Sequence, residues 1–117
     1  MKVTLELWDK PYNAIRAGTK KVEGRVPTSW DQTPFDKMRQ GDTIIFERES
    51  DREQIEVEVL YVHHYKDIRT MLESEGTINV LSGRETVKEG IKSYNSIENY
   101  EENIPTYGIY AIGVKPF

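Results

Sequence analysis

Four charged side chains fall within the six residues from Lys20 to Arg25. An arginine presents a planar fork of donors to a phosphate or a carbonyl, a lysine presents a point charge, and a glutamate accepts from the exocyclic amine of a base. Lys20, Lys21, Glu23 and Arg25 are therefore candidate ligand-binding residues. The alternative is that they are solvated side chains of an exposed strand, paired loosely and contributing under about 1 kcal/mol each.

The strand pattern leaves open which lysine accompanies Glu23. In an unbroken strand, Lys21, Glu23 and Arg25 lie on one face, and Lys20 lies on the other face with Val22. A bulge near Lys20, or a strand that begins after it, would bring Lys20 to the side of Glu23 instead.

Aromatic side chains form a second group of candidates, because unstacked bases are held by flat rings as well as by hydrogen bonds. Trp8, Tyr12, Trp30 and Tyr65 are the residues proposed for this role. The competing interpretation is that these rings fill the core with their polar ends outward.

Metal and cofactor chemistry has little support in the sequence. The chain has no cysteine, which excludes disulfides, thiolate metal sites and cysteine nucleophiles. His63 and His64 are adjacent, so on a strand they face opposite ways, and no third ligand has suitable spacing. We expect no metal and no cofactor.

Length and charge limit the class of protein. The 117 residues, 37% of them hydrophobic, suit one domain over residues 1–117. The net charge of −4 argues against gripping long polyanions by counterion release. Nine of the 16 basic residues but only seven of the 20 acidic residues precede Glu49, so an anion-binding surface is expected in the first half. No stretch resembles a signal peptide or a membrane span, and we expect a cytoplasmic protein.

Hydrophobic periodicity predicts short strands with helices inserted between them. The predicted strands are residues 2–7, 20–26, 43–48, 55–61 and 107–114. The predicted helices run from Asp9 to Gly18, from Asp67 to Glu75 and from Glu85 to Tyr94, with a further helical turn at Phe35–Met38. Strand and helix do not alternate regularly enough for a doubly wound sheet, so the expected fold is α+β, a small and partly closed mixed β-barrel.

The segment from Ile15 to Arg25, IRAGTKKVEGR, resembles the signature of the ASCH domain, in which Gly-x-Lys leads into a strand ending in Glu-x-Arg. Similar motifs follow in the family's order, from Gly41-Asp42 to the final YGIYAI segment that begins at Tyr107. The resemblance implies a PUA-like barrel with a cleft beside the Gly-x-Lys strand, and it implies RNA binding. One bacterial branch of the family hydrolyses the amide of N4-acetylcytidine, and another has been assigned ribonuclease activity.

The resemblance also suggests which residues would act if the protein were an enzyme. The amidohydrolase branch uses a lysine, a threonine three residues later and a later glutamate. Lys20 matches the lysine, but Glu23 stands in place of the threonine, and the later acid would be Glu73 or Glu75. Val22 to Arg25, in contrast, looks like the Val-Glu-Gly-Arg type of ASCH domain, for which RNA binding is the usual suggestion.

The favoured hypothesis is therefore a monomeric module that binds RNA or a nucleotide, recognising a short single-stranded or modified nucleoside segment beside Lys20–Arg25. Two alternatives stay open. One is a metal-independent hydrolase, either N4-acetylcytidine amidohydrolase-like or a ribonuclease, with Lys20 and Glu23 as catalytic residues. The other is a protein-interaction domain that uses the acidic second half.

Overall fold

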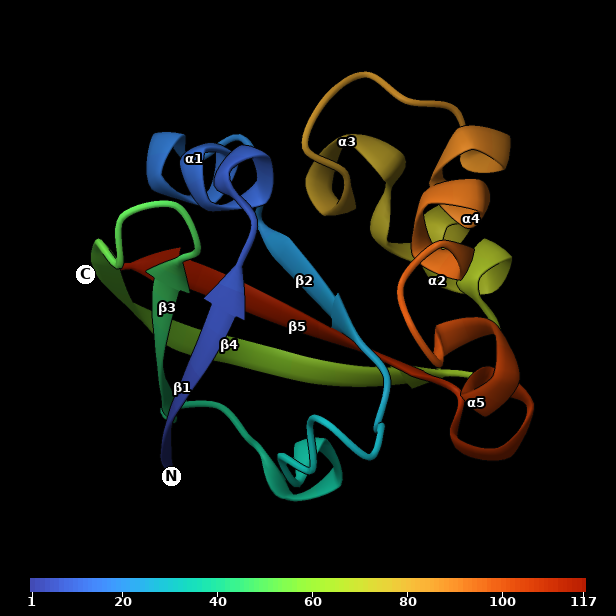
Figure 1. Ribbon diagram of the computed structural model, residues 1–117, viewed down its shortest axis with the longest axis horizontal. Helices are drawn as coiled ribbons and strands as arrows, with labels where there is room; N and C mark the ends of the chain where they lie inside the picture. Colours follow the sequence, from blue (N-terminus) through green and yellow to red (C-terminus); the bar gives the residue numbers. More distant parts are fainter.

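The computed structural model describes residues 1–117 and arranges them around one five-stranded sheet (Figure 1). The strands are β1 (Lys2–Leu7), β2 (Val22–Arg25), β3 (Thr43–Arg48), β4 (Gln54–Tyr65) and β5 (Ile109–Pro116). Their order in the sheet is β1-β3-β4-β5-β2. β1 runs parallel to β3, and the other neighbours are antiparallel. The sheet curls into a half-barrel whose two edges are β1 and β2, and the α+β class and the partly closed barrel are thereby confirmed.

The first helix, α1 (Asp9–Ala17), connects the two edge strands. It begins at Asp9, with Trp8 in the N-cap position, and ends at Gly18. Gly18 adopts a left-handed conformation with φ of 81°, which a glycine reaches without steric cost, and its N–H bonds to the last turn. This tight stop turns the chain straight into the segment that carries Lys20.

The remaining α-helices gather beside β2 and the start of β5 (Figure 1). They are α2 (Ile68–Glu75), α3 (Thr77–Val80), α4 (Val87–Asn95) and α5 (Tyr100–Tyr107), and a 3-10 turn, η1 (Phe35–Lys37), lies between β2 and β3. Asp67 caps α2, and Thr86 and Glu89 form a capping box at the start of α4. None of these helices combines the length and the apolar character that crossing a membrane requires.

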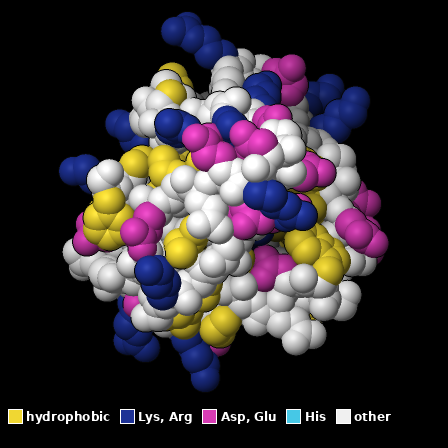
Figure 2. Space-filling view, turned by 60° about the vertical axis from the view of Figure 1, so that its left-hand side comes forward, with side chains coloured by type: hydrophobic (Ala, Val, Ile, Leu, Met, Phe, Trp, Pro, Cys, Tyr) yellow, Lys and Arg dark blue, Asp and Glu magenta, His cyan; other side chains and the backbone are white.

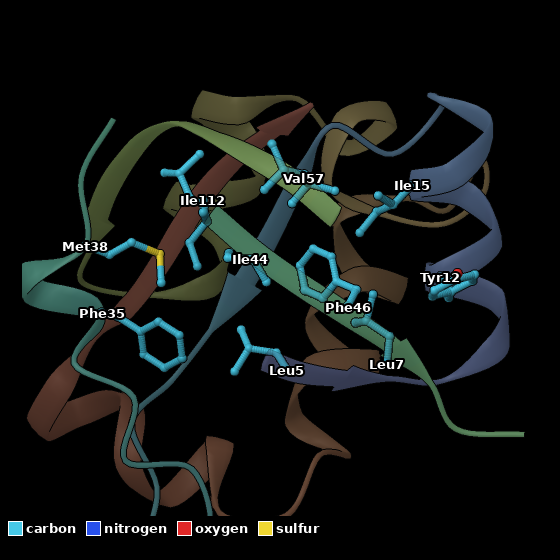
Figure 3. Close-up of a cluster of buried hydrophobic side chains, with 12 residues drawn as sticks. Leu5, Leu7, Tyr12, Ile15, Phe35, Met38, Ile44, Phe46, Val57 and Ile112 are labelled. Carbon is cyan, nitrogen blue, oxygen red and sulfur yellow. The ribbon is translucent and has the colours of Figure 1, made fainter. Parts of the chain in front are cut away.

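Two hydrophobic clusters hold the fold together, one on each side of the curled sheet. The first fills the inside of the curl, where Tyr12 and Ile15 of α1 pack against strand residues such as Phe46 (Figure 3). The second joins β2 and β5 to the helices and includes Val22, Val26 and Met71, with Ile109 and Leu72 among the others. β2 therefore places alternate side chains in two environments, and Glu23 and Arg25 face the inside of the curl.

Several element boundaries differ from the prediction. β2 begins at Val22, two residues after the predicted start, and β4 extends to Tyr65 past an irregularity between Val59 and Tyr61. β5 occupies residues 109–116 instead of 107–114, and α4 starts at Val87 instead of Glu85. The sequence reading did not predict α3 or α5.

Candidate functional site

A cavity of about 610 Å³ lies in the seam between the two edge strands of the half-barrel. It is lined by four consecutive residues of β1, Thr4 to Leu7, and by three consecutive residues of β2, Glu23 to Arg25. A cavity against the face of a strand would meet every second residue, because side chains alternate. Consecutive lining residues place this cavity against the strand edges. α1, the segment after α3, and helices α4 and α5 complete its walls.

Lys20 enters this cavity from the turn between α1 and β2. Its side chain is almost fully buried, and its Nζ donates to the backbone carbonyls of Val22, at 2.6 Å, and Val80. The Oε1 of Glu23 lies 3.2 Å from the same nitrogen. Three acceptors around one nitrogen match the three hydrogens of an ammonium, whereas a neutral amine has only two. Because the strand begins after Lys20, this lysine lies with Glu23, and Lys21 is exposed and outside the cavity lining.

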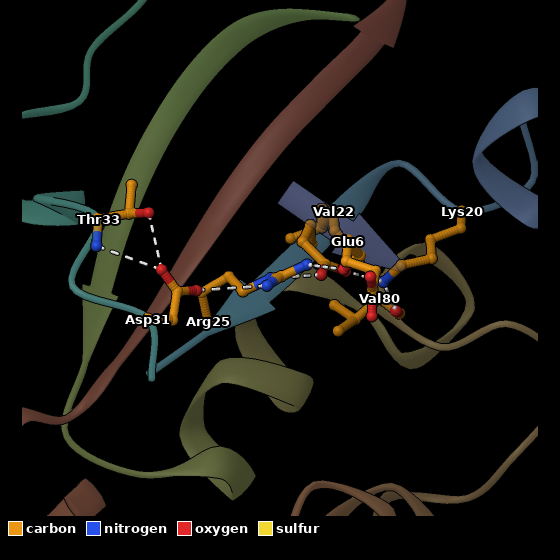
Figure 4. Close-up of polar contacts among 8 residues, drawn as sticks. Glu6, Lys20, Val22, Arg25, Asp31, Thr33 and Val80 are labelled. Carbon is orange, nitrogen blue, oxygen red and sulfur yellow. Dashed lines mark hydrogen bonds and ion pairs between the residues drawn. The ribbon is translucent and has the colours of Figure 1, made fainter. Parts of the chain in front are cut away.

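Glu23 bridges Lys20 to Arg25, and Figure 4 shows these two cations reaching toward one another along β2. The Nε of Arg25 donates to Glu23 Oε2 at 2.7 Å, and its Nη1 lies 3.4 Å from Asp31 Oδ2. Its Nη2 donates to the backbone carbonyl of Glu6, on the opposite edge of the seam, at 2.9 Å. Asp31 is held in turn by the backbone N–H and the hydroxyl of Thr33. The site is thus a chain of paired charges that spans the open side of the barrel.

The protonation states follow from the competition between burial and pairing. Burial pushes the pKa of Glu23 upward, but Lys20 and Arg25 outweigh it and hold that pKa below its ordinary value. Burial lowers the pKa of Lys20, and Glu23 offsets only part of this effect. Burial also acts to lower the pKa of Arg25, yet Glu23 outweighs it and raises the pKa. Glu23 is therefore a carboxylate and Arg25 a cation at neutral pH, while the three acceptors around the Lys20 Nζ identify that group as an ammonium.

Aromatic rings form the wall of the cavity on the helix side of β2. The rings of Tyr94 and Tyr100 are nearly parallel, with centroids 6.4 Å apart, and Trp30 lies parallel to Tyr100 at 6.2 Å. Burial raises the pKa of Tyr100 to about 12 and raises the pKa of Tyr94 well above its usual value. Both tyrosines are therefore neutral hydrogen-bonding groups under physiological conditions.

The rim of the cavity carries two exposed tryptophans and an ion pair. Trp8 is 57% exposed and Trp30 is 49% exposed, and both belong to the lining. Lys10 of α1 lies 3.3 Å from Glu85, which belongs to the segment before α4, so their ion pair joins two walls of the cavity. Figure 2 shows a face of the molecule on which lysine and arginine side chains are interspersed with acidic ones.

Two of the four aromatic candidates lie elsewhere. Tyr12 is fully buried in the cluster inside the curl, and it does not line the cavity. Tyr65 lies near the end of β4, where its hydroxyl donates to Glu75. Glu75 also accepts from Tyr61 and contacts His63, each at 2.7 Å.

The candidate acids of the hydrolase hypothesis are separated from Lys20 and Glu23. Glu75 is engaged by the two tyrosines and His63, Glu73 is exposed, and neither lines the cavity. The sequence reading missed the acids that the fold brings to the cavity, Asp31, Glu85 and Glu6. It also missed Tyr94 and Tyr100, which come from helices far along the chain. Of these five residues, only Asp31 could have been found from the sequence, because it is the acid that follows Arg25 in the polar loop.

The curled sheet, with α1 on its inner side and α2 to α5 on the other side, and the charged cavity in its seam define a PUA-like domain. The model of the ASCH domain matches residues 5–117, and the chain therefore belongs to the ASCH domain family.

Solved structures agree with this assignment. The crystal structure of the hypothetical protein PH0355 has a TM-score of 0.83 and 35% identity, and the match covers 100% of both chains. The solution structure of protein PF0455 from Pyrococcus furiosus has a TM-score of 0.69 and 29% identity, covering 100% of this chain and 98% of that one. A point mutant of ZmASCH from Zymomonas mobilis matches in fold, with a TM-score of 0.60 and 16% identity over 97% of this chain and 68% of its own. No curated protein matches the chain.

Proposed function

We propose that this ASCH domain is a binding module for RNA or nucleotides, and that it takes one base of a short single-stranded or modified segment into the seam cavity. The observation that carries the proposal is a cavity of about 610 Å³ that combines buried charged groups with a wall of parallel aromatic rings. Flat rings and fixed hydrogen-bonding groups are the means by which proteins hold an unstacked base. Membership of a family with a PUA-like fold supports the same class of ligand.

The charge of the cavity favours a single base over an extended duplex. Its cations Lys20 and Arg25 are already engaged by Glu23, Asp31 and backbone carbonyls, and Lys10 pairs with Glu85. The net charge of −4 leaves little basic excess for neutralising many phosphates. Affinity must therefore come mainly from stacking and hydrogen bonds, and it should depend only weakly on salt.

We assign the chain to the Val-Glu-Gly-Arg type of ASCH domain, with amide hydrolysis as the second candidate. The amidohydrolase branch has a threonine where this chain has Glu23, and here that glutamate is tied to both Lys20 and Arg25. The proximity of Lys20 and Glu23 is the observation that favours a hydrolase. Against it, the Lys20 ammonium has all three hydrogens engaged, which leaves no lone pair to accept a proton.

The test is a titration of the protein with nucleosides, nucleotides, short single-stranded RNAs and a long RNA duplex, followed by thermal shift and by the amide resonances of Val22–Arg25. We expect saturable shifts on these amides with short single strands and weaker binding of the duplex. Lys21→Ala is the matched control, because Lys21 is an exposed neighbour outside the cavity.

Two results would contradict the proposal. One is duplex affinity equal to that for short strands, and the other is an absence of any shift on β2. Product formation from N4-acetylcytidine or RNA during the titration, assayed by chromatography, would favour the hydrolase instead.

A further inference from the structure

The two edges of the half-barrel are not joined to each other by backbone hydrogen bonds. In the sheet, β1 pairs only with β3 and β2 pairs only with β5. Each strand therefore has one edge whose peptide groups take no part in the sheet, and both of these edges line the cavity. On β2 the Val22 carbonyl of this edge accepts from Lys20.

The direction of each peptide group of β1 can be read from its ladder bonds. The carbonyls of Met1 and Leu7 accept from the N–H groups of Thr43, at 3.0 Å, and Glu49, at 2.9 Å. The peptide N–H and C=O groups of the odd-numbered residues of β1 therefore point toward β3. Since successive residues of a strand point to opposite edges, the peptide groups of Thr4 and Glu6 point toward the cavity. The contact between the Glu6 carbonyl and Arg25 agrees with this alternation.

Arg25 hydrogen-bonds to one peptide group on the open edge of β1, and two neighbouring peptide groups on that edge have no partner. The Glu6 carbonyl is engaged, so the acceptor that remains is the carbonyl of Thr4, and the donor beside it is the N–H of Glu6. An adjoining β-strand would use such groups, but Arg25 already spans the seam at this point. A planar ring that carries a donor next to an acceptor satisfies both groups in less space, and the ring wall of Trp30, Tyr100 and Tyr94 suits a flat ligand.

We infer that the open edge of β1 is a specificity determinant of the site, in which the Thr4 carbonyl and the Glu6 N–H bind the donor and acceptor edge of a nucleobase. This inference rests on the proposed function and extends it to named peptide groups. The edge selects bases whose donor nitrogen carries a hydrogen, and it rejects bases in which that nitrogen is fully substituted. When a ligand covers the Thr4 carbonyl without offering a donor, the complex lacks that hydrogen bond and still bears the cost of desolvating the carbonyl.

The experiment compares Glu6→Pro, Glu6→Ala and Lys2→Pro in the full chain. Proline at residue 6 removes the Glu6 side chain and an N–H that points away from the ladder, a position where an edge strand tolerates proline. Glu6→Ala retains that N–H and removes the side chain, including its exposed pairing with Arg52. Lys2→Pro introduces proline at another outward-pointing residue of β1, one that does not line the cavity.

The probes are adenosine, cytidine and uridine, each compared with a counterpart methylated at the donor nitrogen: N6,N6-dimethyladenosine, N4,N4-dimethylcytidine and 3-methyluridine. For the best binder, we expect Glu6→Pro and the methylated counterpart each to weaken affinity about tenfold. Lys2→Pro should stay within about twofold of the wild type, and the loss of affinity in Glu6→Pro should exceed that in Glu6→Ala, which removes the side chain alone. In the wild type, the Glu6 amide proton should move downfield on saturation, whereas that of Leu5, bonded within the ladder, should not.

The outcomes separate the inference from the function on which it rests. If a nucleoside binds but the Glu6 amide does not respond and the methylated counterpart binds equally well, the inference is overturned and the binding module stands. These two readouts need no variant, so they decide the matter even if Glu6→Pro fails to fold. If none of the nucleosides or RNAs binds, the proposed function is overturned, and the inference falls with it.

Discussion

The hydroxyl of Tyr94 packs directly against the backbone of Gly24. A Cβ placed on residue 24 would lie 2.5 Å from that hydroxyl oxygen and 2.9 Å from the ring carbon that bears it. Tyr94 has little freedom to withdraw, because it is buried and lies parallel to Tyr100. Gly24 is therefore the residue that lets α4 approach β2, and the glycine between Glu23 and Arg25 has a packing role.

Gly24→Ala should destabilise the fold by about 1–3 kcal/mol, because the added methyl group overpacks a filled site. The free energy of unfolding, measured in urea, checks this value. Gly83→Ala is the matched control, since a Cβ there meets nothing closer than 3.4 Å and should change stability little. Equal stability of the two variants would contradict the packing role of Gly24.

Glu23→Gln should be more severe, with a loss of about 3–5 kcal/mol. The substitution keeps the shape of the side chain but leaves the buried cations Lys20 and Arg25 without their shared carboxylate, and an uncompensated buried charge is costly. Glu47→Gln removes one exposed partner of Arg52 and should have little effect. Urea unfolding of both variants at neutral pH tests the comparison, and similar losses would show that burial of the pair is unimportant.

Acid should remove the contribution of Glu23. Its pKa in the folded protein lies below the ordinary value of 4.5, so its stabilisation is fully present above about pH 4.5 and is lost as the pH falls through the folded pKa. The difference in unfolding free energy between wild type and Glu23→Gln should therefore narrow as the pH falls. Urea unfolding at several values between pH 7 and 3 measures it. A difference that stays constant would place the lost stability in packing instead of charge.

Trp30→Ala should weaken binding of a short single-stranded RNA by about 5- to 150-fold, since stacking on one aromatic ring contributes about 1–3 kcal/mol per base. Fluorescence anisotropy of a labelled strand measures the affinity. The control is Tyr107→Ala, which removes another half-exposed aromatic ring outside the cavity. If both variants bind alike, Trp30 does not contact the ligand.

Most strands could be predicted from sequence, because their burial alternates with a period of two. Residues 43–48 were predicted with the boundaries that the structure has, since Ile44 and Phe46 face the core and the strand ends are polar. The short helices were harder. α3 has four residues, and α5 contains Pro105, so neither has the length or composition that marks a helix in sequence. Tertiary packing of Val80, Tyr100 and Ile104 stabilises them instead.

The candidate site was predictable only along β2. The motif from Lys20 to Arg25 identified the buried charged residues. The alternation of side chains along a strand did not establish whether Lys20 or Lys21 lies beside Glu23. Lys20 is held beside Glu23 by the carbonyl of Val80, the last residue of α3, which is distant in sequence. Tyr12 and Tyr65 were chosen for the same reason as Trp30, because each carries an aromatic ring. The tertiary structure places Tyr12 in the core and Tyr65 beside Glu75, away from the cavity.

The pairing of β2 with β5 has a consequence for the synthesis of the protein. β2 is the second strand to leave the ribosome, yet its partner in the sheet is the last strand, residues 109–116. Until that strand emerges, Glu23 and Arg25 have no sheet to hold them, and the growing chain carries three charges without a pocket around them. The cavity therefore forms only after residues 109–116 have been synthesised and have docked between β4 and β2.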